Sequence, residues 1–194
     1  MPLLALLAVL VAQAPAQPAA LPSYATVVLT TDVGVIEIEV DRANAPVTAA
    51  NFLKYVEAKR YDGGRFHRTV RLDNQPENKV KIEVIQGGVD PRREHEDWPP
   101  IQIERTRDTG LKHRDGTLSM ARDGPDTATS DFFICIGDQP SLDQGGQRNP
   151  DGQGFAAFGR VVKGMDGVRA IQGSPADGQH LTPPVVIRSA RRVP

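Results

Sequence analysis

The sequence contains one cysteine, one tryptophan and only 5% aromatic residues among its 194 positions. A single cysteine cannot form a disulfide within the chain, so the fold depends on its hydrophobic core. Cys135 lies in an apolar run, where a buried and unreactive thiol is expected. Lys and Arg number 23 and Asp and Glu number 24, for a net charge of -1. This balance gives no electrostatic reason to expect nucleic acid or a membrane surface as a partner.

Long hydrophobic runs are also scarce, and the apolar run at 3–12 is shorter than the roughly 20 residues that a membrane-spanning helix needs. Small residues follow it at Ala12, Ala14, Ala16, Ala19 and Ala20. This pattern is typical of a secretory signal peptide, which we expect over residues 1–20 with cleavage after Ala16 or Ala20. No Lys or Arg precedes Arg42, so the terminal amine supplies the only positive charge of this segment. We expect a periplasmic or secreted protein that is free of the membrane after cleavage; an uncleaved anchor and a cytoplasmic location are the alternatives.

Residues 21–194 read as one soluble domain, since the chain is 39% hydrophobic and 24% charged. Ile36, Ile38 and Val40 alternate with acidic residues, which predicts a strand with one buried face. Strands are expected at 24–31, 35–40, around 66–68, and at 80–86, 101–103, 117–121, 132–136, 155–162 and 184–187. Helices are expected at 45–56 and 164–172. Many short strands with two helices indicate a mainly β protein built as a closed antiparallel barrel.

The stretch 116–137 holds two apolar runs on either side of a polar loop at 122–131. Such a pattern predicts two strands with a long connection. The loop is too polar to belong to the core. It is therefore either a solvated connection or one wall of a binding groove beside Met120, Phe132 and Phe133.

This stretch resembles the corresponding segment of cyclophilin-type peptidyl-prolyl cis/trans isomerases. Further matching motifs occur in the family's order: Phe66-His67-Arg68, Gln86-Gly87-Gly88, Leu118-Ser119-Met120-Ala121, Ser141-Leu142-Asp143 and Phe155-Ala156-Ala157-Phe158-Gly159-Arg160-Val161. The resemblance runs from Ala25 to the C-terminus. It implies a closed eight-stranded antiparallel barrel capped by two helices, with the active groove on its outer face. It also implies acceleration of X-Pro bond rotation in unfolded or flexible protein chains.

Rotation about an X-Pro bond is slow because the planar amide loses its resonance, at a barrier of about 20 kcal/mol. No covalent bond breaks, so we expect no nucleophile, no metal and no cofactor. The resemblance makes Arg68 the catalytic residue, whose guanidinium stabilises the twisted amide. It assigns substrate contacts to Phe66, Val84, Gln86, Met120, Ala121, Arg122, Asp131, Phe133, Leu142 and Phe155. Among these, Phe133, Leu142 and Val84 form the proline pocket.

Two further assignments follow from the resemblance. Gln86 would bind the substrate carbonyl, and Arg122 would act mainly through its backbone. The expected partners are proline-containing polypeptides, and we expect a monomer.

Several positions depart from the family pattern. Counted back from Gln86, a pocket phenylalanine falls on Glu83, although Ile82 could fill that space if the strand is shifted by one residue. Asp131 replaces a glutamine, Ser141 a tryptophan and Phe155 a histidine. An unpaired carboxylate avoids an apolar site. A catalytically weak chaperone or scaffold that binds peptides is therefore the alternative function.

Three histidines have plainer interpretations than catalysis. His67 is expected to pack or orient its neighbours, because isomerisation needs no base. His95 lies in a charge run without a second His or Cys at ligand spacing, which favours a solvated surface over a metal site. His113-Arg114-Asp115 matches a kinase tripeptide by chance, since no glycine-rich phosphate loop accompanies it.

Overall fold

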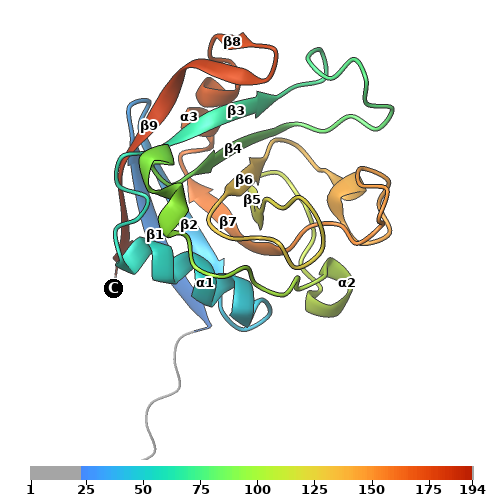
Figure 1. Cartoon of the computed structure of the whole chain (residues 1–194), viewed down its shortest axis with the longest axis horizontal. Helices are drawn as coiled ribbons and strands as arrows, with labels where there is room; N and C mark the ends of the chain where they lie inside the picture. Colours follow the sequence, from blue (N-terminus) through green and yellow to red (C-terminus); the bar gives the residue numbers. More distant parts are fainter. Residues whose placement is uncertain (1–22, 194) are drawn as a thin grey trace, which may run out of the picture.

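The computed structural model describes residues 23–193, so the predicted signal peptide lies outside the described residues. Eight strands close into an antiparallel barrel in the order β1-β2-β7-β5-β6-β4-β3-β9, and β9 pairs with β1 to complete the ring (Figure 1). The eight strands are β1 (Tyr24–Thr31), β2 (Val35–Asp41), β3 (Gly64–Val70), β4 (Val84–Gly88), β5 (Thr117–Met120), β6 (Phe132–Cys135), β7 (Ala157–Lys163) and β9 (His180–Val193). The short β8 (Ala176–Asp177) forms a hairpin with the start of β9 and is not part of the ring. The predicted eight-stranded barrel is confirmed.

Two helices cover the barrel, as predicted. In Figure 1, α1 (Pro46–Glu57) lies at the bottom and α3 (Met165–Gln172) lies toward the top. Both bury an apolar stripe, and Pro46 begins α1 where its missing N–H costs nothing. Three shorter elements lie in the connections: α2 (Thr106–Thr109) and the 3-10 turns η1 (Pro91–Glu96) and η2 (Pro140–Leu142). Within residues 23–193, no helix combines the length and the apolar character needed to cross a bilayer.

Side chains alternate along each strand, so that one set faces the barrel interior and the other faces outward. Along β4 and β6, Ile85, Phe132 and Ile134 belong to the main cluster inside the barrel. Their neighbours face outward and form a second apolar cluster, which consists of Val70, Ile82, Val84, Phe133, Cys135 and Leu142. Ala121 and Phe155 pack against this outer cluster. The barrel therefore has an apolar floor on its outside surface, under the long loops.

A β-bulge at His67 changes the facing of strand β3. Phe66 pairs with Gly87 and Arg68 pairs with the next residue, Gln86, so His67 is the extra residue on β3. Without the bulge, two residues spaced by two would share one face. With it, Phe66 points into the barrel and Arg68 lies outside beside Gln86.

Two predicted strands differ from the structure. The strand expected at 80–86 begins only at Val84 and continues to Gly88. Residues before it form an irregular loop that the buried Gln75 side chain holds closed, with hydrogen bonds to the backbone of Arg71 and Ile82. The strand expected at 101–103 is reduced to a single bridge between Ile101 and Ala128. Neither segment has the continuous ladder of backbone hydrogen bonds that a strand requires. Side-chain hydrogen bonds replace it in the first segment, and one bridge replaces it in the second.

Candidate active site

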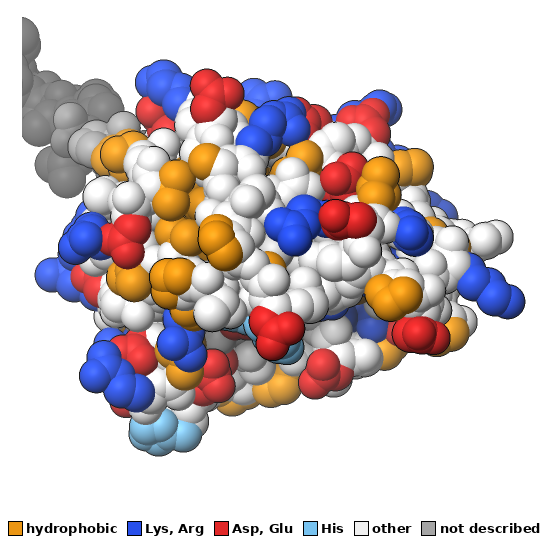
Figure 2. Space-filling model, turned by 90° about the horizontal axis from the view of Figure 1, so that it is seen from above, with side chains coloured by type: hydrophobic (Ala, Val, Ile, Leu, Met, Phe, Trp, Pro, Cys, Tyr) orange, Lys and Arg blue, Asp and Glu red, His pale blue; other side chains and the backbone are white. Residues whose placement is uncertain are grey.

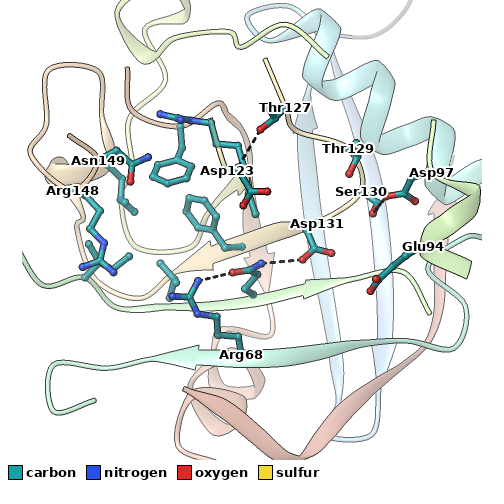
Figure 3. A pocket seen from close by; sticks show the side chains of 18 residues that line it. Arg68, Glu94, Asp97, Asp123, Thr127, Thr129, Ser130, Asp131, Arg148 and Asn149 are labelled. Carbon is teal, nitrogen blue, oxygen red and sulfur yellow. Dashed lines mark hydrogen bonds between the residues drawn. The ribbon is translucent and has the colours of Figure 1, made fainter. Parts of the chain in front are cut away.

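A cavity of about 480 Å³ opens on the outer face of β4, β5 and β6, above the outer apolar cluster (Figure 3). All of the predicted site residues except Phe66 and Met120 line it: Arg68, Val84, Gln86, Ala121, Arg122, Asp131, Phe133, Leu142 and Phe155. The polar loop at 122–131 contributes Asp123, Thr127, Thr129 and Ser130 to its wall. Of the two interpretations of this loop, the structure therefore supports the groove wall.

Phe66 and Met120 do not reach the cavity, which corrects their assignment as substrate contacts. Both side chains lie in the barrel interior, with exposed fractions of 0% and 1%. The bulge between Phe66 and Arg68 lets Arg68 face the cavity while Phe66 faces inward. Met120 shares its inward face with Leu118, while Ser119 and Ala121 take the outer face of the same strand.

The floor of the cavity is apolar and closely packed. Phe133 is only 5% exposed, and its ring meets that of Phe155 edge-on at 5.2 Å and 89°. Leu142 and Val84 complete the floor, as predicted, and Ile82 joins them. A shallow hollow of this kind suits the ring of a proline, which has no polar group to satisfy.

Glu83 is not in the cavity. Its Oε1 accepts a hydrogen bond from Nε2 of Gln172 at 3.1 Å, on the side of helix α3. Ile82 lines the cavity instead and is 7% exposed. The expectation of a carboxylate in the proline pocket is therefore wrong, and the alternative with Ile82 holds. The reason is that β4 starts later than predicted, so residues 82 and 83 do not follow its alternation.

The Arg68 guanidinium is held from two sides by uncharged amides. Nη1 donates to Oε1 of Gln86 at 3.0 Å. Nε and Nη2 both donate to Oε1 of Gln179, at 2.9 and 2.6 Å. Burial of Arg68 lowers its pKa below the ordinary arginine value. Since neither partner carries a negative charge, the positive charge remains available to a ligand.

Gln86 is itself oriented by Asp131. Its Nε2 donates to Oδ2 of Asp131 at 2.9 Å, which directs Oε1 toward Arg68. His67 lies beside the same carboxylate oxygen, with its Nε2 at 3.5 Å from Oδ2. Burial raises the pKa of Asp131, while the Gln86 hydrogen bond and the nearby His67 act in the opposite direction. His67 thus lies where it could pack against or orient this carboxylate, and that role stays a prediction.

The surroundings of Gly88 explain why a glycine is needed at the second position after Gln86. A Cβ atom at Gly88 would collide with the carboxylate of Asp131. Only a residue without a side chain lets Asp131 approach Gln86 from the neighbouring strand. The Gln86-Gly87-Gly88 motif therefore serves the hydrogen-bond network as well as the sheet.

Gln179 was not predicted from the sequence. It lies in the β8–β9 hairpin, and its Nε2 donates to the backbone carbonyl of Asn74 at 3.0 Å. Asn74 in turn donates to the carbonyls of Thr69 and Gly178, both at 3.0 Å. The β8–β9 hairpin and the β3–β4 loop are thus joined beside Arg68. A polar residue in a glycine turn was the only available signal, and it is a weak one.

Arg122 lines the cavity, and hydrogen bonds tie its guanidinium to the loop at 151–154. Nη1 and Nη2 bind the two carboxylate oxygens of Asp151 at 2.7 and 3.0 Å. Nε and Nη2 donate to the carbonyl of Gly154 at 2.8 and 2.6 Å. The guanidinium also lies 5.0 Å from the centroid of the Phe155 ring. Arg122 therefore fixes the loop that presents Phe155.

A buried polar brace lies under Phe133. The His113 ring stacks on the Phe133 ring at 6.0 Å and 15°. Its Nδ1 is 2.8 Å from Oδ1 of Asp143 and its Nε2 is 3.0 Å from the Ser119 hydroxyl. Burial alone would raise the pKa of Asp143, but hydrogen bonds from the His113 ring and backbone outweigh it and lower that pKa.

This Ser-His-Asp group is not a nucleophilic triad, because Ser119 is 0% exposed and no substrate can reach it. Its position makes it a support for the pocket floor. Cys135 is also 0% exposed, and burial raises the pKa of its thiol strongly. It is an inert core residue, as expected.

The remaining polar motifs form no second chemical site. His95 is exposed and lies 3.9 Å from Glu96. Within residues 23–193, no group of three or more His, Cys, Asp or Glu side chains is arranged to hold a metal ion. Arg114 forms a surface ion pair with Asp138. What the site offers is a guanidinium at the edge of an apolar hollow.

Comparisons with known proteins identify the family of this chain. Residues 26–192 match the family model described as cyclophilin type peptidyl-prolyl cis-trans isomerase/CLD. A peptidyl-prolyl cis-trans isomerase of Streptomyces antibioticus is 38% identical over 174 residues, which cover 86% of this chain and 97% of that protein. Peptidyl-prolyl cis-trans isomerase A of Dickeya dadantii is 38% identical over 173 residues, covering 85% of this chain and 83% of that protein.

A solved structure gives the same picture of the fold. The crystal structure of a cyclophilin type isomerase of Cryptosporidium parvum superposes with a TM-score of 0.70 at 23% identity, covering 88% of this chain and 98% of that chain. Sequence motifs, barrel topology and relatives thus agree, and the chain belongs to the cyclophilin-type peptidyl-prolyl cis-trans isomerase family.

Proposed function

We propose that the cavity above β4 and β6 is the place where this protein accelerates X-Pro bond rotation, with Arg68 as its catalytic residue. The observation that carries the proposal is the position of the Arg68 guanidinium. It is held by Gln86 and Gln179 at the edge of the hollow that Phe133, Leu142 and Phe155 form. Proline-containing polypeptides are the substrates. A second Cryptosporidium parvum structure, which was solved in the presence of the dipeptide Ala-Pro, supports this substrate class.

In the proposed mechanism the proline ring lies in the apolar hollow while the preceding peptide plane turns. Twisting localises a lone pair on the proline nitrogen, and a guanidinium aimed at that atom stabilises the twisted state more than either planar form. Gln86 binds a substrate carbonyl through the amide group that Asp131 orients. Ala121 and the Arg122 backbone form the rim. No proton transfer is required, so the Asp131–His67 pair acts by orientation alone.

The expected acceleration of the reaction requires more than one contribution to the lowering of the barrier. Shortening the reaction from tens of seconds to milliseconds needs a factor of about 10⁴, or about 5.5 kcal/mol. One well-placed donor contributes about 3–4 kcal/mol. Removal of water from the amide and fixation of the ring by the pocket account for the remainder. Arg68 is therefore necessary and is not sufficient.

A protease-coupled assay on an Ala-Pro tetrapeptide tests the proposal. The wild-type protein should shorten the cis-to-trans phase well below that of buffer, and Arg68→Ala should lose about 100-fold or more in kcat/KM. Circular dichroism and the melting temperature of the variant control for its folding. Wild-type turnover equal to buffer, together with measurable peptide binding, would instead support a peptide-binding chaperone or scaffold.

We also propose that residues 1–20 are a signal peptide and that residues 21–194 form the exported bacterial domain. The support is the apolar run at 3–12 with its alanines, and the bacterial relatives at 37–38% identity. The mass of the exported protein tests this: it should correspond to a chain that begins at Gln17 or Leu21. The mass of the full-length chain would contradict the proposal.

A single chain contains every lining residue of the cavity, so we propose that a monomer performs the reaction. Nucleic acid is not a partner in this proposal. Positive and negative side chains are interspersed over the face seen in Figure 2, and the net charge is -1. Such a surface lacks the single-sign field that nucleic acid requires.

A further inference from the structure

Two guanidiniums share one end of the cavity. Arg148 lines it together with Arg68, and it comes from the loop between η2 and β7. Nη1 of Arg148 donates to Oε1 of Gln75 at 3.0 Å and to the carbonyl of Val80 at 2.7 Å. Arg148 is therefore fixed against the β3–β4 loop, at the side of the cavity where that loop and the β6–β7 loop meet.

Neither guanidinium has a carboxylate partner among residues 23–193. Every hydrogen bond that the structure gives to Arg68 and Arg148 ends on an uncharged amide or carbonyl oxygen. Burial lowers the pKa of Arg148, and the nearby charge of Arg68 lowers it further. Two half-buried like charges without a counter-ion repel one another. An anion placed between or beside them would relieve that repulsion.

The opposite end of the cavity has the opposite charge. Glu94 and Asp97 line it, with Asp123 and Asp131 between the two ends. Figure 3 shows Arg148 and Asn149 at the left of the cavity and Asp97 and Glu94 at the right. The hollow therefore presents positive charge on one side of the proline pocket and negative charge on the other.

We propose that the Arg148 end of the cavity binds a carboxylate of the substrate, so that the protein prefers prolines with an acidic residue on the flank that lies over Arg148. This rests on the proposed function, because the peptide must occupy the cavity with its proline above Phe133. If Arg148 only tied the two loops together, the donors that it does not use for that purpose would have no role. Both hydrogen bonds of its guanidinium to residues 23–193 use Nη1, and Nη2 and Nε remain for a planar, two-oxygen ligand.

Isosteric peptides test the proposal by charge alone. A parent peptide carries glutamine on each flank of an Ala-Pro pair, and glutamate replaces one glutamine at a time. The rate of isomerisation is measured from NMR exchange cross-peaks, which impose no sequence requirement of their own. On one flank, glutamate should raise kcat/KM by about three- to tenfold over glutamine. On the other flank, near the acidic wall, it should lower kcat/KM.

Two variants that each remove one positive charge distinguish a local effect of Arg148 from the effect of the protein's overall charge. Arg148→Gln should abolish the gain, so that the glutamate and glutamine peptides are turned over with equal kcat/KM by this variant. Arg188→Gln is the matched control, since Arg188 lies on β9 in an ion pair with Asp32 and is not part of the cavity. It should keep the gain. Peptides with amidated C-termini show whether the glutamate side chain binds at Arg148. The same peptides with free C-termini show whether a terminal carboxylate binds there.

A glutamate-to-glutamine ratio of one or less on both flanks would overturn the proposal, as would a gain that survives in Arg148→Gln. If Arg148→Gln fails to fold, the wild-type ratio is followed against salt. A charge-based gain falls toward one at about 0.5 M NaCl, and an unchanged ratio would contradict it. Failure of the proposed function itself would look different, because then the glutamine parent peptide would not be turned over either.

Discussion

At the scale of single residues, the neutrality of the partners of Arg68 matters as much as their distance. Oε1 of Gln179 accepts two hydrogen bonds from the guanidinium, at 2.9 and 2.6 Å. A carboxylate at this position would hold the side chain at least as firmly, because charge-assisted pairs are stronger. It would also neutralise the charge that the twisted amide needs. One substitution at Gln179 can therefore distinguish the effect of holding Arg68 in position from the effect of leaving its charge available.

We expect Gln179→Glu to lower kcat/KM by about tenfold while its melting temperature stays at or above that of the wild type. Gln179→Ala, which leaves Arg68 charged and less ordered, should lose about threefold and melt lower. Activity and thermal melts of the two variants provide the measurement. A purely structural role predicts the reverse order of activities.

The chain offers a matched control for this experiment. Gln153 also accepts a hydrogen bond from an arginine, Nε of Arg105, at 2.6 Å. It does not line the cavity. Gln153→Glu should therefore leave turnover unchanged. If it slows turnover as much as Gln179→Glu does, the effect of charge at position 179 is not local.

At the scale of elements, the pocket floor depends on the contact between the segment that precedes β5 and the residue that follows η2. Asp143 accepts a hydrogen bond from the His113 backbone at 3.1 Å and contacts the His113 ring at 2.8 Å. The folded state lowers the pKa of Asp143, so its contribution to stability is present above the unfolded carboxyl pKa near 4. That contribution is lost as the pH falls through the lower, folded value.

Asp143→Asn should therefore destabilise the protein at pH 7 by about 1–3 kcal/mol, because it removes a charged acceptor from two hydrogen bonds. Thermal melts at a series of pH values provide the measurement. The gap between wild type and variant should be widest near neutrality and should narrow as the pH falls below about 4. A gap that widens in acid would contradict this account of Asp143.

Elements also mark the limit of what the sequence predicts. A β-branched run identified β1, alternation identified β2, and a proline with an apolar stripe identified α1. Alternation could not reveal the bulge at His67, because a bulge interrupts the very periodicity on which such a prediction depends. The family resemblance assigned Phe66 to the substrate site together with Arg68, but the bulge between them leaves Phe66 in the core.

At the scale of the whole molecule, closure of the barrel is what assembles the site. Arg68, Gln86, Asp131 and Gln179 come from distant parts of the sequence and meet because β3 lies between β4 and β9. The family resemblance supplied Arg68, Gln86 and the apolar floor. Gln179 and Arg148 were missed, since each depends on where a loop lies after the barrel has closed. Loop contacts of this kind leave no periodic signal.

The central claim is that Arg68 acts on the twisted amide more than on the bound ground state. The most direct measurement compares the dissociation constant of an Ala-Pro peptide with its rate of isomerisation when bound, both by NMR, in wild type and Arg68→Ala. We predict that the dissociation constant changes by less than about threefold while the bound rate falls by about 100-fold or more. A variant whose bound peptide still isomerises at the wild-type rate, or whose loss lies entirely in affinity, would contradict the account.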